Sequence, residues 1–74
     1  MNKSVDEQIG AKVGELREQA SMSIDTVAQA CGLTSKEYTD SEAGVRRFSI
    51  PELFELCNVF GVSLSDIFGD RPSR

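Results

Sequence analysis

The chain has 74 residues, with 12 Asp and Glu against 8 Lys and Arg and a net charge of -4. This length accommodates one small domain and excludes large enzymes and ligand-gated regulators. The acidic balance counts against an extensive basic surface for nucleic acid, because phosphate binding normally requires one.

Helix starts and stops are marked clearly. A Ser or Thr followed three residues later by an acid forms a capping box, in which both side chains accept hydrogen bonds from free backbone N–H groups. The pattern occurs at Ser4/Glu7, Thr34/Glu37, Ser49/Glu52 and Ser63/Asp66, with a simpler cap at Ser23 and glycine stops at Gly32, Gly44 and Gly61. In chain order, the predicted helices cover residues 4–20, 24–31, 34–42, 50–60 and 64–68.

No segment alternates with the period of a strand, so the predicted fold class is all-α. We expect a single domain over residues 1–68 and a disordered tail over 69–74. No segment approaches the roughly 18 uncharged apolar residues that a membrane span requires, and the N-terminus has no apolar signal core. We therefore expect a soluble, cytoplasmic protein with no membrane association.

Residues 23–42 have the layout of a helix-turn-helix. The buried stripe of the first helix consists of Ile24, Val27, Ala28 and Cys31. Gly32 suits the turn, Leu33 fills the gap between the helices, and Thr34 caps the second helix. In this motif the second helix is presented to a DNA major groove.

The ordered set of residues resembles the Cro/repressor-type (Xre-like) helix-turn-helix regulators over about residues 9–68. The matching pieces are Ile9-Gly10, Leu16-Arg17-Glu18, Val27-Ala28, Cys31 to Thr34, Glu42-Ala43-Gly44, Arg46, Ser49, Leu53 and Phe60 to Phe68. The resemblance implies a compact five-helix, lambda-repressor-like DNA-binding domain, in which the second and third helices form the DNA-reading unit.

The resemblance also implies roles for individual residues. Base-reading positions fall on Ser35, Lys36, Thr39 and Asp40. Contacts to the DNA backbone fall on Arg46, Arg47, Lys12 and Thr34. Arg17 and Glu42 match an internal ion pair of the family that ties the first helix to the end of the reading helix. From residue types alone, the same polar residues are also typical of a solvated surface, with Arg46 and Arg47 offsetting local acids.

Four positions depart from an ordinary member of the family. Ile24 stands where a phosphate-contacting Gln is common, and Asp40 replaces a polar or basic reader. Ser41 replaces a large apolar residue, and Phe48 replaces a frequent Pro. We hypothesise that Phe48 fills part of the space vacated at Ser41. Because the motif and the following loop are nearly neutral, we expect DNA binding with a shallow salt dependence.

The predicted function is that of a sequence-specific transcriptional regulator, repressor-like, which binds double-stranded DNA as a two-fold homodimer on an inverted repeat. Candidates for the dimer or partner surface are Phe54, Val59, Ile67 and Phe68. Of these, Phe54 is the better exposed candidate, and we interpret Ile67 and Phe68 as core residues.

The alternative function is an interaction module, such as an antitoxin, anti-repressor or co-regulator, that binds a protein partner. Asp40, Ile24 and the acidic balance favour this alternative. The chain has no His, no motif-borne nucleophile and little room for a pocket, so we predict no enzymatic activity, cofactor or small-molecule ligand. We expect Cys31 and Cys57 to be reduced core residues, with no metal site.

Overall fold

Five α-helices account for the regular structure of the computed structural model, which describes residues 4–68. They are α1 (Val5–Gln19), α2 (Ile24–Cys31), α3 (Ser35–Glu42), α4 (Ile50–Phe60) and α5 (Leu64–Phe68). This confirms the all-α prediction and places each helix boundary within one residue of its expected position. The disordered tail predicted for 69–74 lies outside the described residues.

The helices begin at the predicted caps. The hydroxyls of Ser4, Ser23, Thr34 and Ser49 each accept a hydrogen bond from a backbone N–H one turn into the helix. Helices α2 and α4 end at Gly32 and Gly61, which both adopt the left-handed conformation that glycine accommodates without strain. Local sequence signals therefore explain where the helices lie.

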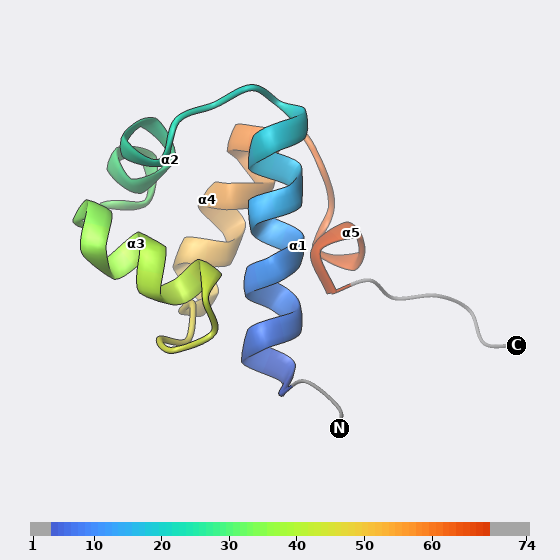
Figure 1. Cartoon of the computed structure of the whole chain (residues 1–74). Coiled ribbons are helices and arrows are strands. Elements are labelled where there is room, and N and C mark those ends of the chain that lie inside the picture. The colour runs from blue at the N-terminus through green and yellow to red at the C-terminus, as the bar shows by residue number, and fades with distance from the viewer. Residues whose placement is uncertain (1–3, 69–74) are drawn as a thin grey trace, which may run out of the picture.

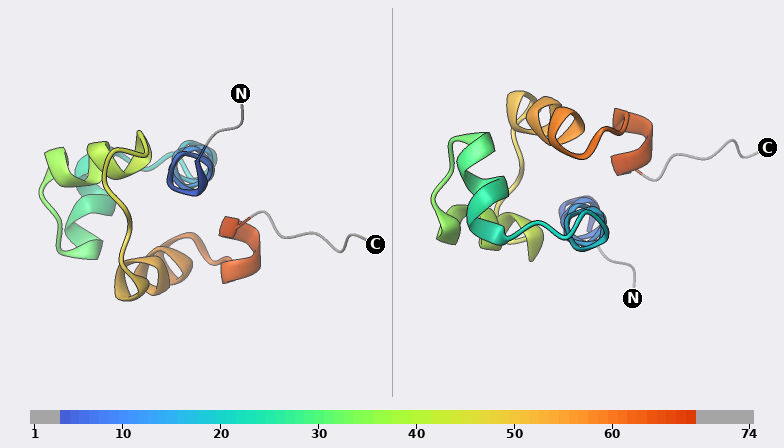
Figure 2. Two further views of the ribbon diagram at one scale, coloured as in Figure 1. Left: turned by 90° about the horizontal axis from the view of Figure 1, so that it is seen from below. Right: turned by 90° about the horizontal axis from the view of Figure 1, so that it is seen from above.

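Helix α1 is the longest helix, and in the view of Figure 1 it stands between α3 and α5. It packs against α3, α4 and α5, while α2 packs against α3 and α4. The α2–α3 pair lies on one side of α1 and α5 on the other, as the further views also show (Figure 2). This arrangement leaves the outer side of α3 uncovered by any other helix.

Every helix contributes to a single core. The most deeply buried apolar side chains, each at most 1% exposed, are Val13, Val27, Tyr38, Leu56 and Ile67, one from each helix. The burial of Ile67 confirms its interpretation as core. Tyr38 was not predicted to be a core residue, because α3 is otherwise polar and carries no apolar stripe to indicate its buried side.

The crossing of α1 and α3 is unusually close at Gly10. A Cβ atom on this glycine would clash with the backbone carbonyl oxygens of Ser41 and Glu42. Ser41 is fully buried beside this crossing. Gly10 weakens α1 as an isolated helix, but it allows α3 to pack directly against α1.

Candidate nucleic-acid interface

The turn between α2 and α3 sets the orientation of α3. Gly32 has a φ of 74°, and the N–H of Leu33 donates to the carbonyl of Ala28 at 2.9 Å, which closes the end of α2. Tyr38 and Ser41 are fully buried, so their side of α3 packs against the rest of the protein. Its outer side consequently faces solvent at the positions expected to read bases.

The four candidate base-reading residues lie on that outer side. Ser35, Lys36 and Thr39 are exposed, and Asp40 is half-buried. Lys36 Nζ lies 3.0 Å from Asp40 Oδ2, one turn away, and 83% of the Lys36 side chain is exposed. The Ser35 hydroxyl donates to the carboxylate of Asp25 at the start of α2. The arrangement brings donors and acceptors together on one surface with no excess of positive charge.

The two arginines of the loop between α3 and α4 have different environments. Arg46 makes a bidentate ion pair with Glu52, with N–O distances of 3.0 and 2.9 Å, and also donates to the Ser41 hydroxyl at 3.0 Å. The hydrogen bonds between Arg46 and Glu52 lower the pKa of the Glu52 carboxyl and raise the pKa of the Arg46 guanidinium. The guanidinium of Arg46 therefore joins α3, the loop and α4.

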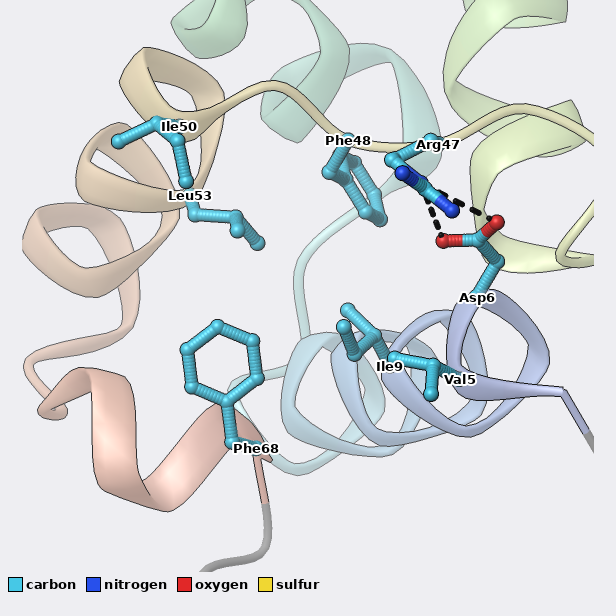
Figure 3. A pocket seen from close by; sticks show the side chains of 8 residues that line it. All are labelled: Val5, Asp6, Ile9, Arg47, Phe48, Ile50, Leu53 and Phe68. Atoms are coloured by element: carbon cyan, nitrogen blue, oxygen red, sulfur yellow. Dashed lines mark hydrogen bonds and ion pairs between the residues drawn. The ribbon is translucent and has the colours of Figure 1, made fainter.

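Arg47, by contrast, points outward. Its Nε lies 3.0 and 3.3 Å from the two carboxylate oxygens of Asp6, and 80% of its side chain is exposed (Figure 3). Of the two loop arginines, it is the more exposed. The remaining backbone candidates are Lys12, which lies 3.5 Å from Glu15, and Thr34, whose hydroxyl serves as the cap of α3.

Positive charge is closely matched by acids throughout the described part of the chain. The shortest ion pair of each cation is Lys12–Glu15, Arg17–Glu42, Lys36–Asp40, Arg46–Glu52 or Arg47–Asp6. They include every lysine and arginine between residues 4 and 68. A DNA phosphate would therefore meet cations that already have a carboxylate partner, which reduces the electrostatic part of binding.

Arg17 of α1 and Glu42 at the C-terminal end of α3 form an ion pair. Arg17 Nε lies 2.8 Å from Glu42 Oε2, and a second guanidinium nitrogen donates to the carbonyl of Met22 at 3.1 Å. The hydroxyl of Tyr38 is buried close to this pair with no hydrogen-bond partner among the described residues. Burial raises the pKa of Tyr38, and the charge of Glu42 acts in the same direction. The phenol therefore stays neutral.

The residues that depart from the family pattern lie in different environments. Ile24 is half-buried and packs against the core. Phe48 is 6% exposed, and its ring lies 6.1 Å from that of Tyr38, centroid to centroid. The Ser41 hydroxyl accepts a hydrogen bond from Arg46. The proposal that Phe48 compensates for the small Ser41 remains a prediction.

An apolar groove opens on the side of the molecule away from α2. It has a volume of about 320 Å³ and is lined by Val5, Asp6, Ile9, Arg47, Phe48, Ile50, Leu53 and Phe68. The side chains of Ile9, Phe48, Leu53 and Phe68 face a shared space between α1, α4 and α5, and Val5 and Ile50 lie toward its edges (Figure 3). Phe68 is 49% exposed at its edge, which differs from its expected place in the core.

The other residues of the predicted dimer or partner surface differ in exposure. Phe54 is 53% exposed on α4, whereas Val59 is half-buried and packs against the core. Ile50, one turn before Phe54, is 61% exposed and shares its side of the helix. The outward apolar surface of α4 and α5 therefore centres on Ile50, Phe54 and Phe68.

Cys31 and Cys57 are free and half-buried, and burial raises the pKa of Cys31 to about 11 and raises that of Cys57 as well. No helix within residues 4–68 is long and apolar enough to cross a membrane. Over the same residues, no group of three or more His, Cys, Asp or Glu side chains could hold a metal ion.

The acids that are hydrogen-bonded to the candidate DNA-contacting residues are not predicted from the sequence. In the sequence, the capping box at Ser49 already accounts for Glu52. Nothing else in the sequence indicates that Glu52 also forms an ion pair with Arg46. Asp6 and Arg47 are separated by 41 positions, and Asp25 and Ser35 by 10. Only the packing of the helices brings these partners together.

Comparisons with known proteins agree on the type of fold. A helix-turn-helix family model matches residues 13–67 of the chain. Among solved structures, the crystal structure of the clp gene regulator ClgR from C. glutamicum superposes with a TM-score of 0.82 at 21% identity, covering 89% of this chain and 86% of that chain. No curated protein sequence matches. The family match spans most of the five-helix unit, and the predicted lambda-repressor-like fold is confirmed.

Proposed function

Because the chain belongs to the Cro/repressor-type (Xre-like) helix-turn-helix family of DNA-binding transcription regulators, we propose that it is a repressor-like regulator that reads specific DNA sequences with α3. In this proposal α3 enters the major groove of double-stranded DNA in the cytoplasm. The proposal includes no enzymatic step and no cofactor.

The exposed outer side of α3 is the observation that supports this proposal. The α2–α3 turn and the burial of Tyr38 orient the helix so that Ser35, Lys36 and Thr39 face solvent together. In the major groove, a lysine can donate to the acceptor edge of guanine, and a threonine can offer its methyl group to thymine. Asp40 can accept from the amino group of cytosine if Lys36 moves to a base.

Phosphate contacts position the helix without reading the sequence. Arg47 is the main candidate for this role, since its side chain is exposed in the loop after α3. Lys12 and Thr34 are secondary candidates. Arg46 supports the loop through Glu52 and Ser41, and we propose that it contributes to DNA binding mainly by holding the loop in place.

A two-fold homodimer would extend recognition to an inverted repeat, because one small domain contacts too few base pairs to select a genomic site. The exposed apolar side chains of Ile50, Phe54 and Phe68 support a dimer surface on α4 and α5. A contact there would leave α3 uncovered in both copies, since α5 and α3 lie on different sides of α1 (Figure 2).

A second candidate function is an interaction module that binds a protein partner. It is favoured by the pairing of every described cation with an acid, which leaves the α3 surface nearly neutral. In that case the exposed residues of α3 or α4 would contact the partner, and binding of the chain alone to DNA would be absent.

Selection of duplexes from a random-sequence pool distinguishes the two functions. The purified protein is incubated with the pool at about 50 and 200 mM salt, because specific contacts survive the higher salt better than phosphate contacts do. We expect enrichment of an inverted repeat that is lost in the double variant Lys36→Ala/Thr39→Ala. The variant Gln19→Ala, an exposed residue at the end of α1, serves as a control that retains the enrichment.

The absence of any enriched sequence at both salt concentrations would exclude sequence-specific binding by the protein alone. Enrichment that survives the double variant would exclude α3 as the reading helix. Enrichment of a single half-site in place of an inverted repeat would contradict the dimer and leave the reading role of α3 in place.

A further inference from the structure

The loop between α3 and α4 rests on the first turn of α1. Gly44, in this loop, has a φ of 83°, and a Cβ atom on it would lie 2.7 Å from the Cα of Glu7. Three residues later, Arg47 makes its ion pair with Asp6. The segment that carries the main candidate phosphate contact is thus packed against an acidic helix turn.

The two members of the Asp6–Arg47 pair are unequally exposed. The Asp6 side chain is 26% exposed, whereas that of Arg47 is 80% exposed. Asp6 belongs to a helix that is capped at Ser4, and a carboxylate in the first turn is stabilised by the helix dipole. The acid is therefore fixed on the protein, and the arginine is the partner that is able to leave.

We propose that Asp6 sets the affinity for DNA by competing with the phosphate backbone for Arg47, an inference that rests on the proposed function. A carboxylate and a phosphate accept the same hydrogen bonds from a guanidinium. Each phosphate contact by Arg47 then requires the loss or sharing of the contact with Asp6. Such an exposed ion pair is weak, so the exchange lowers affinity without preventing binding.

Arg46 shows why the competition concerns Arg47 in particular. Its guanidinium is held by both carboxylate oxygens of Glu52 and by the Ser41 hydroxyl, and 32% of its side chain is exposed. Exchange with a phosphate would break these three hydrogen bonds and a longer one, of 3.5 Å, to the carbonyl of Arg47. Asp40 holds Lys36 in a similar exposed pair, but Asp40 is itself a candidate reading residue. Asp6 lies on α1 and outside the helix-turn-helix, so its substitution leaves every candidate reading residue unchanged.

The test uses the isosteric substitution Asp6→Asn, which removes the charge and keeps the shape of the side chain. The control is Glu55→Gln, an exposed acid on α4 whose substitution changes the net charge equally. Affinities for a mixed-sequence duplex and for a selected duplex are measured by fluorescence anisotropy over a range of salt concentrations. Thermal unfolding of each variant verifies that it is folded.

The competition predicts that Asp6→Asn binds both duplexes about two- to fivefold more tightly than the Glu55→Gln control, as expected for the release of an exposed ion pair. The slope of log affinity against log salt should become steeper by up to about 0.9, the value for one additional phosphate contact. In the double variant Asp6→Asn/Arg47→Gln, the gain over Arg47→Gln should disappear.

Three results would overturn the inference. If the wild type binds and Asp6→Asn matches the Glu55→Gln control, the competition is refuted while the DNA-binding function stands. If the gain persists without Arg47, Asp6 acts through general charge and not through this arginine. If neither the wild type nor Asp6→Asn binds any duplex at low salt, the inference and the proposed function fail together.

Discussion

Arg17 in α1 and Glu42 at the end of α3 are joined by an ion pair of 2.8 Å whose two side chains are only 15% and 17% exposed. The pair links α1 to the C-terminal end of α3, the proposed reading helix, next to the close crossing at Gly10. Because both charges are largely removed from water, each depends on the other for its compensation.

Substitution of Glu42 should therefore be costly. We expect Glu42→Gln to lower the free energy of unfolding by about 3 kcal/mol, because it leaves the guanidinium of Arg17 largely buried without its counter-charge. Chemical denaturation followed by circular dichroism measures the change. Glu18→Gln is the control, since Glu18 is 76% exposed and lies 4.0 Å from the same guanidinium. Equal stability of the two variants would show that the Arg17–Glu42 pair does not hold α1 and α3 together.

Because α1 and α3 cross closely at Gly10, replacing this glycine with alanine should destabilise the protein, although the same change normally stabilises a helix. Gly to Ala in an exposed helix stabilises by about 1 kcal/mol. Gly10→Ala should instead destabilise by about 2 kcal/mol, because the added methyl group clashes with two backbone carbonyl oxygens of α3.

Gly14→Ala provides the matched comparison for this steric effect. Its Cβ atom would lie 3.2 Å from the carboxylate of Glu42, a contact relieved by a shift of a few tenths of an ångström and not by movement of the backbone, so we expect a much smaller loss. Thermal unfolding of both variants is sufficient for the comparison. A Gly10→Ala protein as stable as the wild type would mean that the two helices are further apart than described.

Acid should weaken the contact between the loop and α4. Hydrogen bonds from Arg46 lower the pKa of Glu52 below its ordinary value of 4.5. A carboxyl with a lowered pKa in the folded state stabilises the protein above its unfolded-state pKa, and this contribution is lost as the pH falls through the folded-state pKa. We expect Glu52→Gln to be less stable than the wild type by about 2 kcal/mol at neutral pH.

That stability difference should shrink as the pH falls below 4.5, because the wild-type carboxylate is then progressively protonated. Urea denaturation of the wild type and Glu52→Gln from pH 7 to pH 3 measures the difference directly. A gap between the two proteins that stays constant over the whole range would contradict the charge-dependent role of Glu52.

The exposed apolar surface of α4 and α5 predicts a specific effect on self-association. We expect the wild type to sediment as a dimer at high concentration and Phe54→Asp to shift the equilibrium toward the monomer, because it places a charge in the proposed contact. Stability of the monomer should change little, since Phe54 is 53% exposed. Val45→Asp, at a site 79% exposed in the loop, is the control. A wild type that is monomeric at its highest soluble concentration would refute the dimer.

The helices could be predicted almost completely from the sequence, and the charged contacts could not. Ser23, Thr34 and Gly32 mark the helix-turn-helix through local chemistry that acts within one turn of the chain. The burial of Tyr38 depends on which side of a polar helix meets α1, and the pairing of Arg47 with Asp6 depends on the folded path of the loop. Both are properties of packing between distant segments, for which a single sequence contains no local signal.

The reading role of α3 is tested most directly by mapping the DNA-binding surface residue by residue. Amide chemical shifts of the ¹⁵N-labelled protein are recorded while the duplex recovered by selection, or otherwise a mixed-sequence duplex, is added at low salt. We predict the largest changes at residues 34–40 and in the loop at 44–49, with small changes along α5. Changes confined to α4 and α5, with the amides of α3 unaffected, would contradict it.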